Sequence, residues 1–362
     1  MDQVMKYYWA LHQMPELSFH EVKTASFLQQ ALKDMGYAPV RVGETGLYAD
    51  LCVDPKLPWL VFRADMDALP VTEETGAACM SENPGVMHAC GHDAHMSMLL
   101  TAAQTLKDKQ LPQNIRFLFQ PAEEITSGAK MMVEMGVLPE NTVAVFGFHV
   151  WPNVPKGKIV AKEGPLMASS TRFAIICNGK NAHCSKRYDG ADALMTAAQI
   201  ATRFHEAEAM AEEDGTVLFC GKFHSGTAHN IVASQAEMTG TLRTFSEQKR
   251  KLVLSKLESI IDECAIQYGT KGSLEIQAFN PAVINPQALA DKIQCLFPET
   301  ITDWEPALAA EDFACYQQEV PGMFLWLGVG DTAALHNGKF LVPLEVLDIG
   351  VAGWLRIANH KW

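Results

Sequence analysis

Four short apolar runs recur along the chain, at residues 60–62, 115–119, 143–148 and 324–327. Each run is nearly continuous and does not alternate between apolar and polar positions. This pattern is typical of strands buried on both faces, as in a mostly parallel sheet covered by helices. We therefore predict an α/β fold in which these four runs belong to one sheet.

Polar side chains that suit chemistry follow these runs, where each strand is expected to end. They are Asp65 and Asp67 after the first run, Glu123 and Glu124 after the second, His149 after the third, and His336 after a glycine-containing loop beyond the fourth. Ligands of open α/β sheets bind beyond the carboxyl ends of the strands. We therefore expect these groups to converge on one crevice.

Helical patterns lie between the runs. Residues 17–35 form an amphipathic pattern that Gly36 ends. Its apolar face consists of Ala25, Leu28, Leu32 and Met35. A second, more apolar helix is expected over 96–106.

The stretch from 167 to 277 has a different pattern, which predicts an inserted domain. We expect a strand at 170–177, a helix at 189–205, strands near 217–224 and 237–244, a helix at 247–268 and a strand at 273–278. This βαββαβ order is that of the split ferredoxin-like fold. The first domain then comprises residues 1–166 and 278–362.

The composition excludes several classes of protein. The chain has 362 residues, 48% hydrophobic and 20% charged, which supports two packed domains. Its net charge of −13 argues against a nucleic-acid partner, which calls for basic patches. No apolar run approaches the roughly 18 residues that cross a bilayer, and residues 1–6 do not begin a signal peptide, so no membrane partner is expected. Nine cysteines, an odd number, then indicate reduced thiols in a cytoplasmic protein.

The densest chemistry lies in residues 87–95, Met-His-Ala-Cys-Gly-His-Asp-Ala-His, which hold a thiol, three imidazoles and a carboxylate. Imidazole and thiolate together favour a zinc-like metal ion. The alternative is a buried cysteine beside surface histidines, since free cysteine is commonly a small core residue. Four ligand-type side chains in one short run favour the metal site.

Glu123 and Glu124 are adjacent carboxylates, which cannot point the same way in an extended segment. One can bind a metal ion while its neighbour takes and returns a proton of the attacking water. The alternative is a helix N-terminus, where acidic residues favour the dipole. Asp65, His149 and His336 are ambiguous when taken singly. A turn or helix cap often explains a single aspartate at such a position, and a lone histidine is more often a hydrogen-bonded core residue than a ligand.

Several motifs together resemble one family of enzymes. They are Phe-Arg-Ala-Asp-Met-Asp-Ala-Leu-Pro at 62–70, Met-His-Ala-Cys-Gly-His-Asp at 87–93, Phe-Gln-Pro-Ala-Glu-Glu at 119–124, Gly-Thr-Leu-Arg-Thr-Phe at 240–245 and Glu-Asp-Phe-Ala at 311–314. The chain resembles, over nearly its whole length, the amidohydrolase branch of the aminoacylase and carboxypeptidase metallopeptidases. The resemblance implies hydrolysis of an N-acyl amino acid, such as N-acetyldiaminopimelate, or of a dipeptide.

The resemblance also implies roles for particular residues. Two divalent ions, zinc or manganese, would be bound by Cys90, His92, Glu124, His149 and His336, with the Cys90 sulfur near or between them. Glu123 would be the general base, and Asp65 the carboxylate that orients a ligand. The insert would be a lid that forms a homodimer or higher oligomer. It would supply His183 as an oxyanion partner, and Asn230 and Arg243 as substrate contacts.

The chain departs from the family pattern in the expected lid loop. Asn181 and Ala182 replace a usual Gly-Gly pair, and 184–188 read Cys-Ser-Lys-Arg-Tyr instead of Ala-Ala-x-Pro-His. This altered loop is the one feature that favours an alternative in which the chain is an inactive relative that serves as a binding module. In another alternative, Cys90 is the nucleophile of a cysteine hydrolase, although its metal-ligand neighbours disfavour that role.

Overall fold

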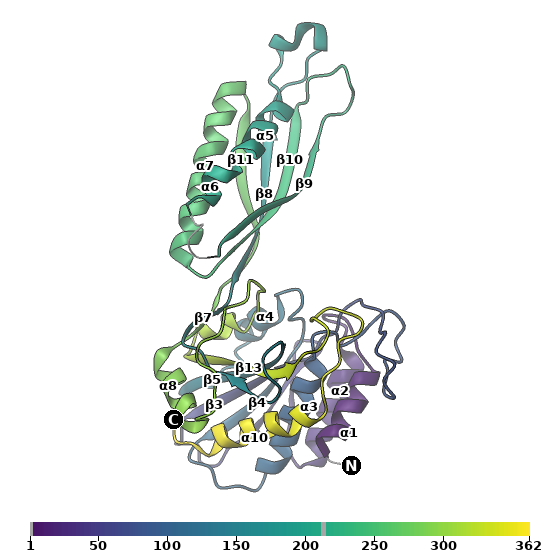
Figure 1. Cartoon of the computed structure of the whole chain (residues 1–362), viewed down its shortest axis with the longest axis vertical. Coiled ribbons are helices and arrows are strands. Elements are labelled where there is room, and N and C mark those ends of the chain that lie inside the picture. The colour runs from purple at the N-terminus through teal and green to yellow at the C-terminus, as the bar shows by residue number, and fades with distance from the viewer. Residues whose placement is uncertain (1–2, 211–214) are drawn as a thin grey trace. The chain divides into compact units, whose positions relative to one another are not determined.

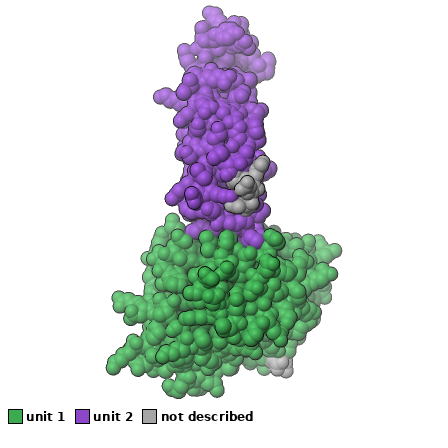
Figure 2. Space-filling view, turned by 60° about the vertical axis from the view of Figure 1, so that its left-hand side comes forward, with its two compact units in different colours: residues 1–166, 283–305, 311–362 green, residues 167–282, 306–310 purple. Residues whose placement is uncertain are grey.

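The computed structural model describes residues 3–210 and 215–362, which form two compact units (Figure 1). The first comprises residues 1–166, 283–305 and 311–362, and the second comprises 167–282 and 306–310; Figure 2 colours them separately. The second unit thus extends five residues beyond the predicted boundary at 277. It also includes 306–310, because the amide of Ala168 donates to the carbonyls of Ala307 and Ala309.

The first unit is built on a seven-stranded sheet of order β1-β2-β4-β3-β5-β13-β6. These strands are β1 (Val40–Val42), β2 (Gly46–Leu51), β3 (Trp59–Asp65), β4 (Asn114–Gln120), β5 (Thr142–Pro152), β6 (Ile159–Val160) and β13 (Gly322–Gly330). The four predicted apolar runs are the four central strands, which pair in parallel. The expectation of a mostly parallel sheet holds only there, because β1, β2 and β6 pair antiparallel at the edges. β7 (Gly164–Met167) and β12 (Val283–Asn285) form a separate pair.

Helices cover this sheet. They are α1 (Gln3–Gln13), α2 (Val22–Asp34), α3 (His92–Leu106), α4 (Gly128–Glu134), α8 (Gln287–Leu296), α9 (Ala314–Gln317) and α10 (Glu345–Asn359). The helix expected from residue 17 begins only at Val22, because Phe19 adopts a left-handed backbone with φ of 61°. Among the helices of the described ranges, none combines the length and apolar character that a bilayer span requires.

The two faces of each central strand bury different chemistry. Phe62 and Phe148 point to one face, where both rings contact Trp354 of α10. Alternate residues point to the other face, because successive side chains of a strand alternate. Near the carboxyl ends of β3, β4 and β5 that face bears Arg63, Gln120 and His149, all buried. One face of the sheet thus packs on α10 through apolar side chains, and the opposite face carries polar side chains near the carboxyl ends of the strands.

The second unit has the element order βαββαβ and a four-stranded antiparallel sheet of order β11-β8-β10-β9. Its elements are β8 (Ser169–Asn178), a 3₁₀ turn (Cys184–Asp189), α5 (Ala193–Thr202), α6 (Phe204–Glu208), β9 (Val217–Ser225), β10 (Gln235–Thr244), α7 (Glu247–Tyr268) and β11 (Lys271–Asn280). The single helix expected over 189–205 is divided into these shorter pieces. Its core includes Phe173, Ile200 and Leu257, and is separate from that of the first unit.

Candidate metal centre

Cys90 and His92 flank Gly91 where the loop after β3 enters α3. Gly91 has a left-handed φ of 84°, and a Cβ there would lie 2.4 Å from a methyl carbon of Val150. Only glycine fits such a position. The Sγ atom of Cys90 then lies 3.5 Å from the Nε2 atom of His149.

One ring nitrogen of His92 is hydrogen-bonded, and the other is not bonded in this way to any residue that the structure describes. Its Nδ1–H donates to the backbone carbonyl of Asp67 at 2.9 Å. Within the described residues, Nε2 is buried without a hydrogen-bond partner, as is Oε1 of Glu124, 3.8 Å away. Two buried, unpaired ligand atoms facing each other fit a bound cation, because buried polar atoms otherwise find partners.

His149 and His336 complete the set of predicted ligands. The Nδ1–H of His149 donates to the carbonyl of Val150 at 2.7 Å, which leaves Nε2 as a lone-pair donor facing Cys90. Burial first, and then His95, hold the pKa of His149 well below its usual range. His336 has an unusual left-handed φ of 63°, and its Nε2 lies 3.4 Å from Oε2 of Glu124.

The five predicted ligands form two groups that share Cys90. Cys90, His92 and His149 place their ligand atoms within 4.8 Å of one another, and so do Cys90, Glu124 and His336. Thiolate, imidazole and carboxylate ligands suit zinc. The residues present therefore fit a pair of cations with the sulfur common to both groups.

Asp67 fixes the turn that carries the two glutamates. Its Oδ1 accepts the backbone N–H of Glu123, and its Oδ2 accepts that of Glu124, both at 3.0 Å. Oδ2 also accepts the hydroxyl of Ser18 at 2.7 Å. Because its backbone carbonyl also accepts from His92, Asp67 orients both a predicted ligand and the turn that carries Glu123 and Glu124. The sequence analysis assigned it no such role, although its place beside Asp65 was a usable signal.

Asp65, predicted to orient a ligand, has different partners. Its Oδ1 accepts Nδ1–H of His95 at 2.6 Å, and its Oδ2 accepts Nη1 of Arg63 at 2.7 Å. Nε2 of His95 in turn accepts the amide of Val150. Asp65 thus lies 3.8 Å from the free Nε2 of His92 while Asp67 holds that ring's other nitrogen. His92, His95 and Arg63 together hold the pKa of Asp65 well below its usual range, against the effect of burial.

A buried ionic network lies behind Glu123. Arg63 donates to Gln120 Oε1 at 2.8 Å, Asp65 Oδ2 at 2.7 Å, Glu311 Oε1 at 2.9 Å and Asp312 Oδ1 at 3.0 Å. Carboxylate oxygens of Glu123, Glu311 and Asp312 lie within 4.8 Å of one another. Burial first, and then Glu311, raise the pKa of Glu123 well above its usual range. The arginine inside an apolar strand was the sequence signal for this network.

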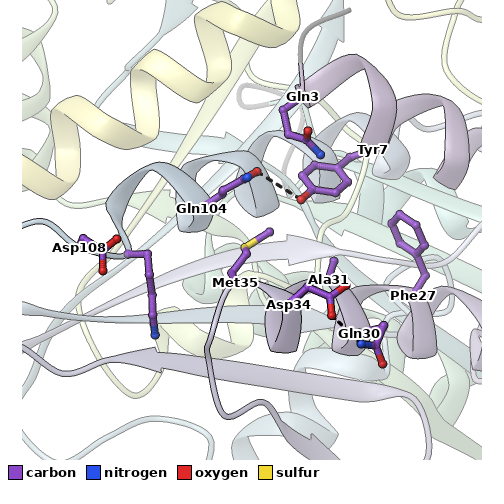
Figure 3. A pocket seen from close by; sticks show the side chains of 10 residues that line it. Gln3, Tyr7, Phe27, Gln30, Ala31, Asp34, Met35, Gln104 and Asp108 are labelled. Atoms are coloured by element: carbon purple, nitrogen blue, oxygen red, sulfur yellow. Dashed lines mark hydrogen bonds between the residues drawn. The ribbon is translucent and has the colours of Figure 1, made fainter.

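A pocket of about 530 Å³ lies in another part of the first unit, and Figure 3 shows the side chains that line it. Its ten lining residues come from α1, α2 and the carboxyl end of α3 and include Gln3, Asp34 and Lys107. His92 begins the 15-residue α3, which spans about 22 Å at 1.5 Å per residue. The pocket is therefore separate from the candidate metal centre.

The remaining predicted residues lie in the second unit. His183 is exposed, and its ring bonds the hydroxyl of Ser185 at 2.8 Å. The carbonyl of Asn230 accepts the amide of Cys184, so this segment lies beside that of His183. Arg243 of β10 is half-buried, and its Nη1 atom has no hydrogen-bond partner within the described residues.

A family model connects this geometry to known proteins. The model of peptidase family M20/M25/M40 matches residues 61–360. The chain belongs to this family. The resemblance inferred from the motifs, and with it the prediction of a metal-dependent hydrolase, is confirmed.

Relatives within the family have similar lengths. The N-acetylcysteine deacetylase of Bacillus subtilis (strain 168) is 34% identical over 349 residues, which cover 94% of this chain and 91% of the relative. The N-acetyldiaminopimelate deacetylase of Streptococcus suis (strain 05ZYH33) is 34% identical and covers 94% of both chains. A solved Bacillus subtilis structure, described as a dinuclear metal-binding peptidase of the M20 family, has a TM-score of 0.88. It is 32% identical and covers 98% of this chain and 96% of its own.

Proposed function

We propose that this protein hydrolyses the amide bond of an N-acyl amino acid at a centre of two divalent metal ions. The observation that carries the proposal is the pair of ligand groups sharing Cys90, with the buried carboxylate of Glu123 beside them. The deacetylase names of the relatives at 34% identity support this reaction class. N-Acetyldiaminopimelate and dipeptides remain candidate substrates within that class.

Zinc or manganese is the proposed pair of ions. Cys90, His92 and His149 would hold one ion, and Cys90, Glu124 and His336 the other. Bound in this way, a divalent ion lowers the pKa of water and polarises a carbonyl oxygen. A thiolate ligand favours zinc, whereas carboxylates also suit manganese.

Glu123 is the proposed proton carrier. Its carboxylate accepts the proton of the attacking water and returns it to the nitrogen of the leaving amine. Burial, and then Glu311, raise the pKa of this carboxyl well above its usual range, which favours the binding of a proton by Glu123. The backbone amides of Glu123 and Glu124 both donate to the Asp67 carboxylate, which would keep the two glutamate side chains pointing in different directions.

We also propose that the second unit acts as a lid and as the surface through which two copies associate. His183 would stabilise the developing oxyanion, while Asn230 and Arg243 would contact the substrate. Support for Arg243 comes from its unpaired Nη1 atom, which suits a substrate carboxylate. A cytoplasmic location stays a prediction.

A cysteine nucleophile is the weaker alternative. Reactive cysteines have a lowered pKa, whereas burial first, and then Glu124, Glu123 and Asp65, raise the pKa of Cys90 well above its usual range. A metal ligand needs no such lowering beforehand, because a bound ion deprotonates the coordinating thiol.

Metal analysis combined with a substrate panel tests the proposal. The purified protein should contain about two divalent ions per chain, and it should release free amine from at least one N-acetyl or N-benzoyl amino acid. Chelators should abolish this activity, and added zinc or manganese should restore it. Activity that survives chelation but is lost on thiol alkylation would transfer the reaction to Cys90. Absence of turnover by the metal-loaded protein across the panel would reject the proposed reaction.

A further inference from the structure

The turn that carries Glu123 and Glu124 has an unfavourable backbone. Ala122 and Thr126 both have left-handed φ angles, of 55° and 52°. Side chains other than glycine, asparagine and aspartate rarely adopt this conformation. Such a turn persists only where its surroundings determine it.

Glu21 captures the first amide of this turn. Its Oε1 accepts the backbone N–H of Ala122 at 2.9 Å and that of Phe19 at 3.0 Å. Both donors belong to residues with left-handed backbones. The side chain of Glu21 is fully buried and has lost its hydration. The two accepted hydrogen bonds compensate for part of that cost.

The position of Glu21 would normally serve a different purpose. It is the N-cap residue of α2, yet its side chain makes no capping hydrogen bond to that helix. Glu16 provides the capping bond instead. Its Oε2 accepts both the backbone N–H of Thr24, at 2.9 Å, and the hydroxyl of Thr24, at 3.0 Å. The carboxylate of Glu16 thus caps helix α2, and the side chain of Glu21 is free to bond the turn that carries Glu123 and Glu124.

The same segment also supports the other anchor of the turn. Ser18 donates to Asp67, which accepts the amides of Glu123 and Glu124. Two carboxylates, Glu21 and Asp67, therefore hold three successive amides of the turn. The segment 16–21 therefore supplies the Glu21 carboxylate and, through Ser18, holds the Asp67 carboxylate in place.

We propose that Glu21 is a positioning residue that sets the direction of the Glu123 and Glu124 side chains through the backbone of Ala122. The expected effect on kcat rests on the proposed function, whereas the expected effect on the backbone of the turn does not. A misplacement of about 1 Å in a catalytic group can lower a rate roughly 10²-fold. Without the acceptor, the Ala122 amide is left unpaired and the turn becomes free to open.

Hydrogen exchange and kinetics on the full-length protein test this proposal. Glu21→Ala should raise amide exchange in the peptide covering 119–128 by about tenfold, the effect of losing one hydrogen bond. It should lower kcat by roughly 10–100-fold with little change in KM. Glu21→Gln retains the acceptor oxygen, so it should stay within about threefold of wild type in both measurements.

Glu16→Ala is the matched control, because it removes a carboxylate from the same segment that only caps α2. It should raise exchange at the start of α2 and leave both kcat and exchange over 119–128 unchanged. If Glu21→Ala does not fold, Glu21→Asp serves in its place, because its shorter side chain withdraws the acceptor from the Ala122 amide and should likewise raise exchange over 119–128.

Two outcomes would overturn the inference. One is unchanged exchange over 119–128 in Glu21→Ala, or in Glu21→Asp where that variant replaces it. The other is a Glu21→Gln protein as impaired as Glu21→Ala, which would assign the effect to charge and not to the accepted hydrogen bond. Failure of the wild type to hydrolyse any N-acyl amino acid would reject the proposed function alone, because the exchange measurements need no substrate.

Discussion

The Nε2 atom of His336 lies 3.4 Å from Oε2 of Glu124, although the two residues come from distant parts of the sequence. The backbone of His336 is held in a left-handed conformation by a hydrogen bond from its amide to the carbonyl of Ala89. The carbonyl of Gly338 accepts the amide of Glu74 and fixes the same loop from its other side. His336, a predicted ligand, is thus held in place by backbone hydrogen bonds that do not depend on a bound metal ion.

The adjacent glutamates should have separable roles. Glu123→Gln keeps the shape of the side chain but cannot accept a proton, so kcat should fall by about 10²–10⁴-fold while the metal content stays unchanged. Glu124→Gln should instead lower the metal content. Kinetics combined with metal analysis of each variant checks this. Equal loss of metal from both variants would show that the roles are wrongly divided.

Removal of the Cys90 sulfur should affect both ligand groups, because both include it. Cys90→Ala should therefore lower metal content and decrease the rate by at least the roughly 10–100-fold that outer hydrogen-bond partners of metal ligands contribute. Elemental analysis after dialysis measures the first effect. The exposed Cys52→Ala is the control and should retain both metal and rate. A Cys90→Ala protein with full metal content and normal activity would contradict the ligand assignment.

Replacement of Asp67 should weaken metal binding, although Asp67 is not a predicted ligand. Asp67→Asn leaves one oxygen where two accept hydrogen bonds from Glu123, Glu124 and Ser18, and it turns an NH₂ group toward a donor. Metal affinity should fall roughly 10–100-fold, as for other groups that orient ligands. Competition with a chromogenic chelator measures the affinity. Wild-type affinity in Asp67→Asn would show that His92 and the glutamate turn hold their positions without this carboxylate.

The hydrophobic pattern was sufficient to locate the central strands, since buried parallel strands are continuous apolar runs. Ligand-type side chains at the strand ends then indicated the centre. Contacts between a side chain and a distant backbone amide leave no periodic signal. The role of Glu21 therefore could not be predicted, and the place of Asp67 after a strand indicated the site but not its hydrogen-bond partners. Phe19 shows a second limit, because its left-handed backbone interrupts a helical pattern that extends to residue 17 in the sequence.

His183 should affect the rate without affecting the metal. Its side chain is exposed in the second unit and, within the described part of the chain, hydrogen-bonds only to Cys184 and Ser185, so its replacement should not disturb folding. His183→Ala should lower kcat by roughly 10²–10³-fold, the effect of losing one oxyanion donor. The comparison needs equal metal content and equal melting temperature. An unchanged kcat would exclude the oxyanion role, and sedimentation as a monomer at micromolar concentration would exclude the dimer.

His12 forms a buried bridge between two carboxylates, one of which belongs to Asp93, the residue after His92. Its Nδ1 lies 2.5 Å from Asp93 Oδ2, and its Nε2 lies 3.2 Å from Glu73 Oε1. Although burial alone would lower it, Asp93 first and then Glu73 raise the pKa of His12 to about 9. His12 also lowers the pKa of Asp93, against the effect of burial. The bridge is therefore ionised at neutral pH and links α1 to the first turn of α3.

The raised pKa of His12 predicts a loss of stability in alkaline solution. The folded state binds the His12 proton more tightly than the unfolded state, whose pKa is about 6.5. This contribution is therefore complete below pH 6.5 and disappears as pH rises through about 9. A shift from 6.5 to about 9 corresponds to roughly 3 kcal/mol as an upper figure.

Urea unfolding of the wild type and of His12→Gln at several pH values between 6 and 10 measures this contribution. The difference in unfolding free energy should be largest near pH 6.5 and should shrink toward pH 10, whereas the exposed His20→Gln should follow the wild type throughout. In NMR spectra of histidine-labelled protein, one imidazole should titrate with a midpoint near 9 and be absent from His12→Gln. A difference that stays constant with pH would show that His12 stabilises the fold by packing and not by charge.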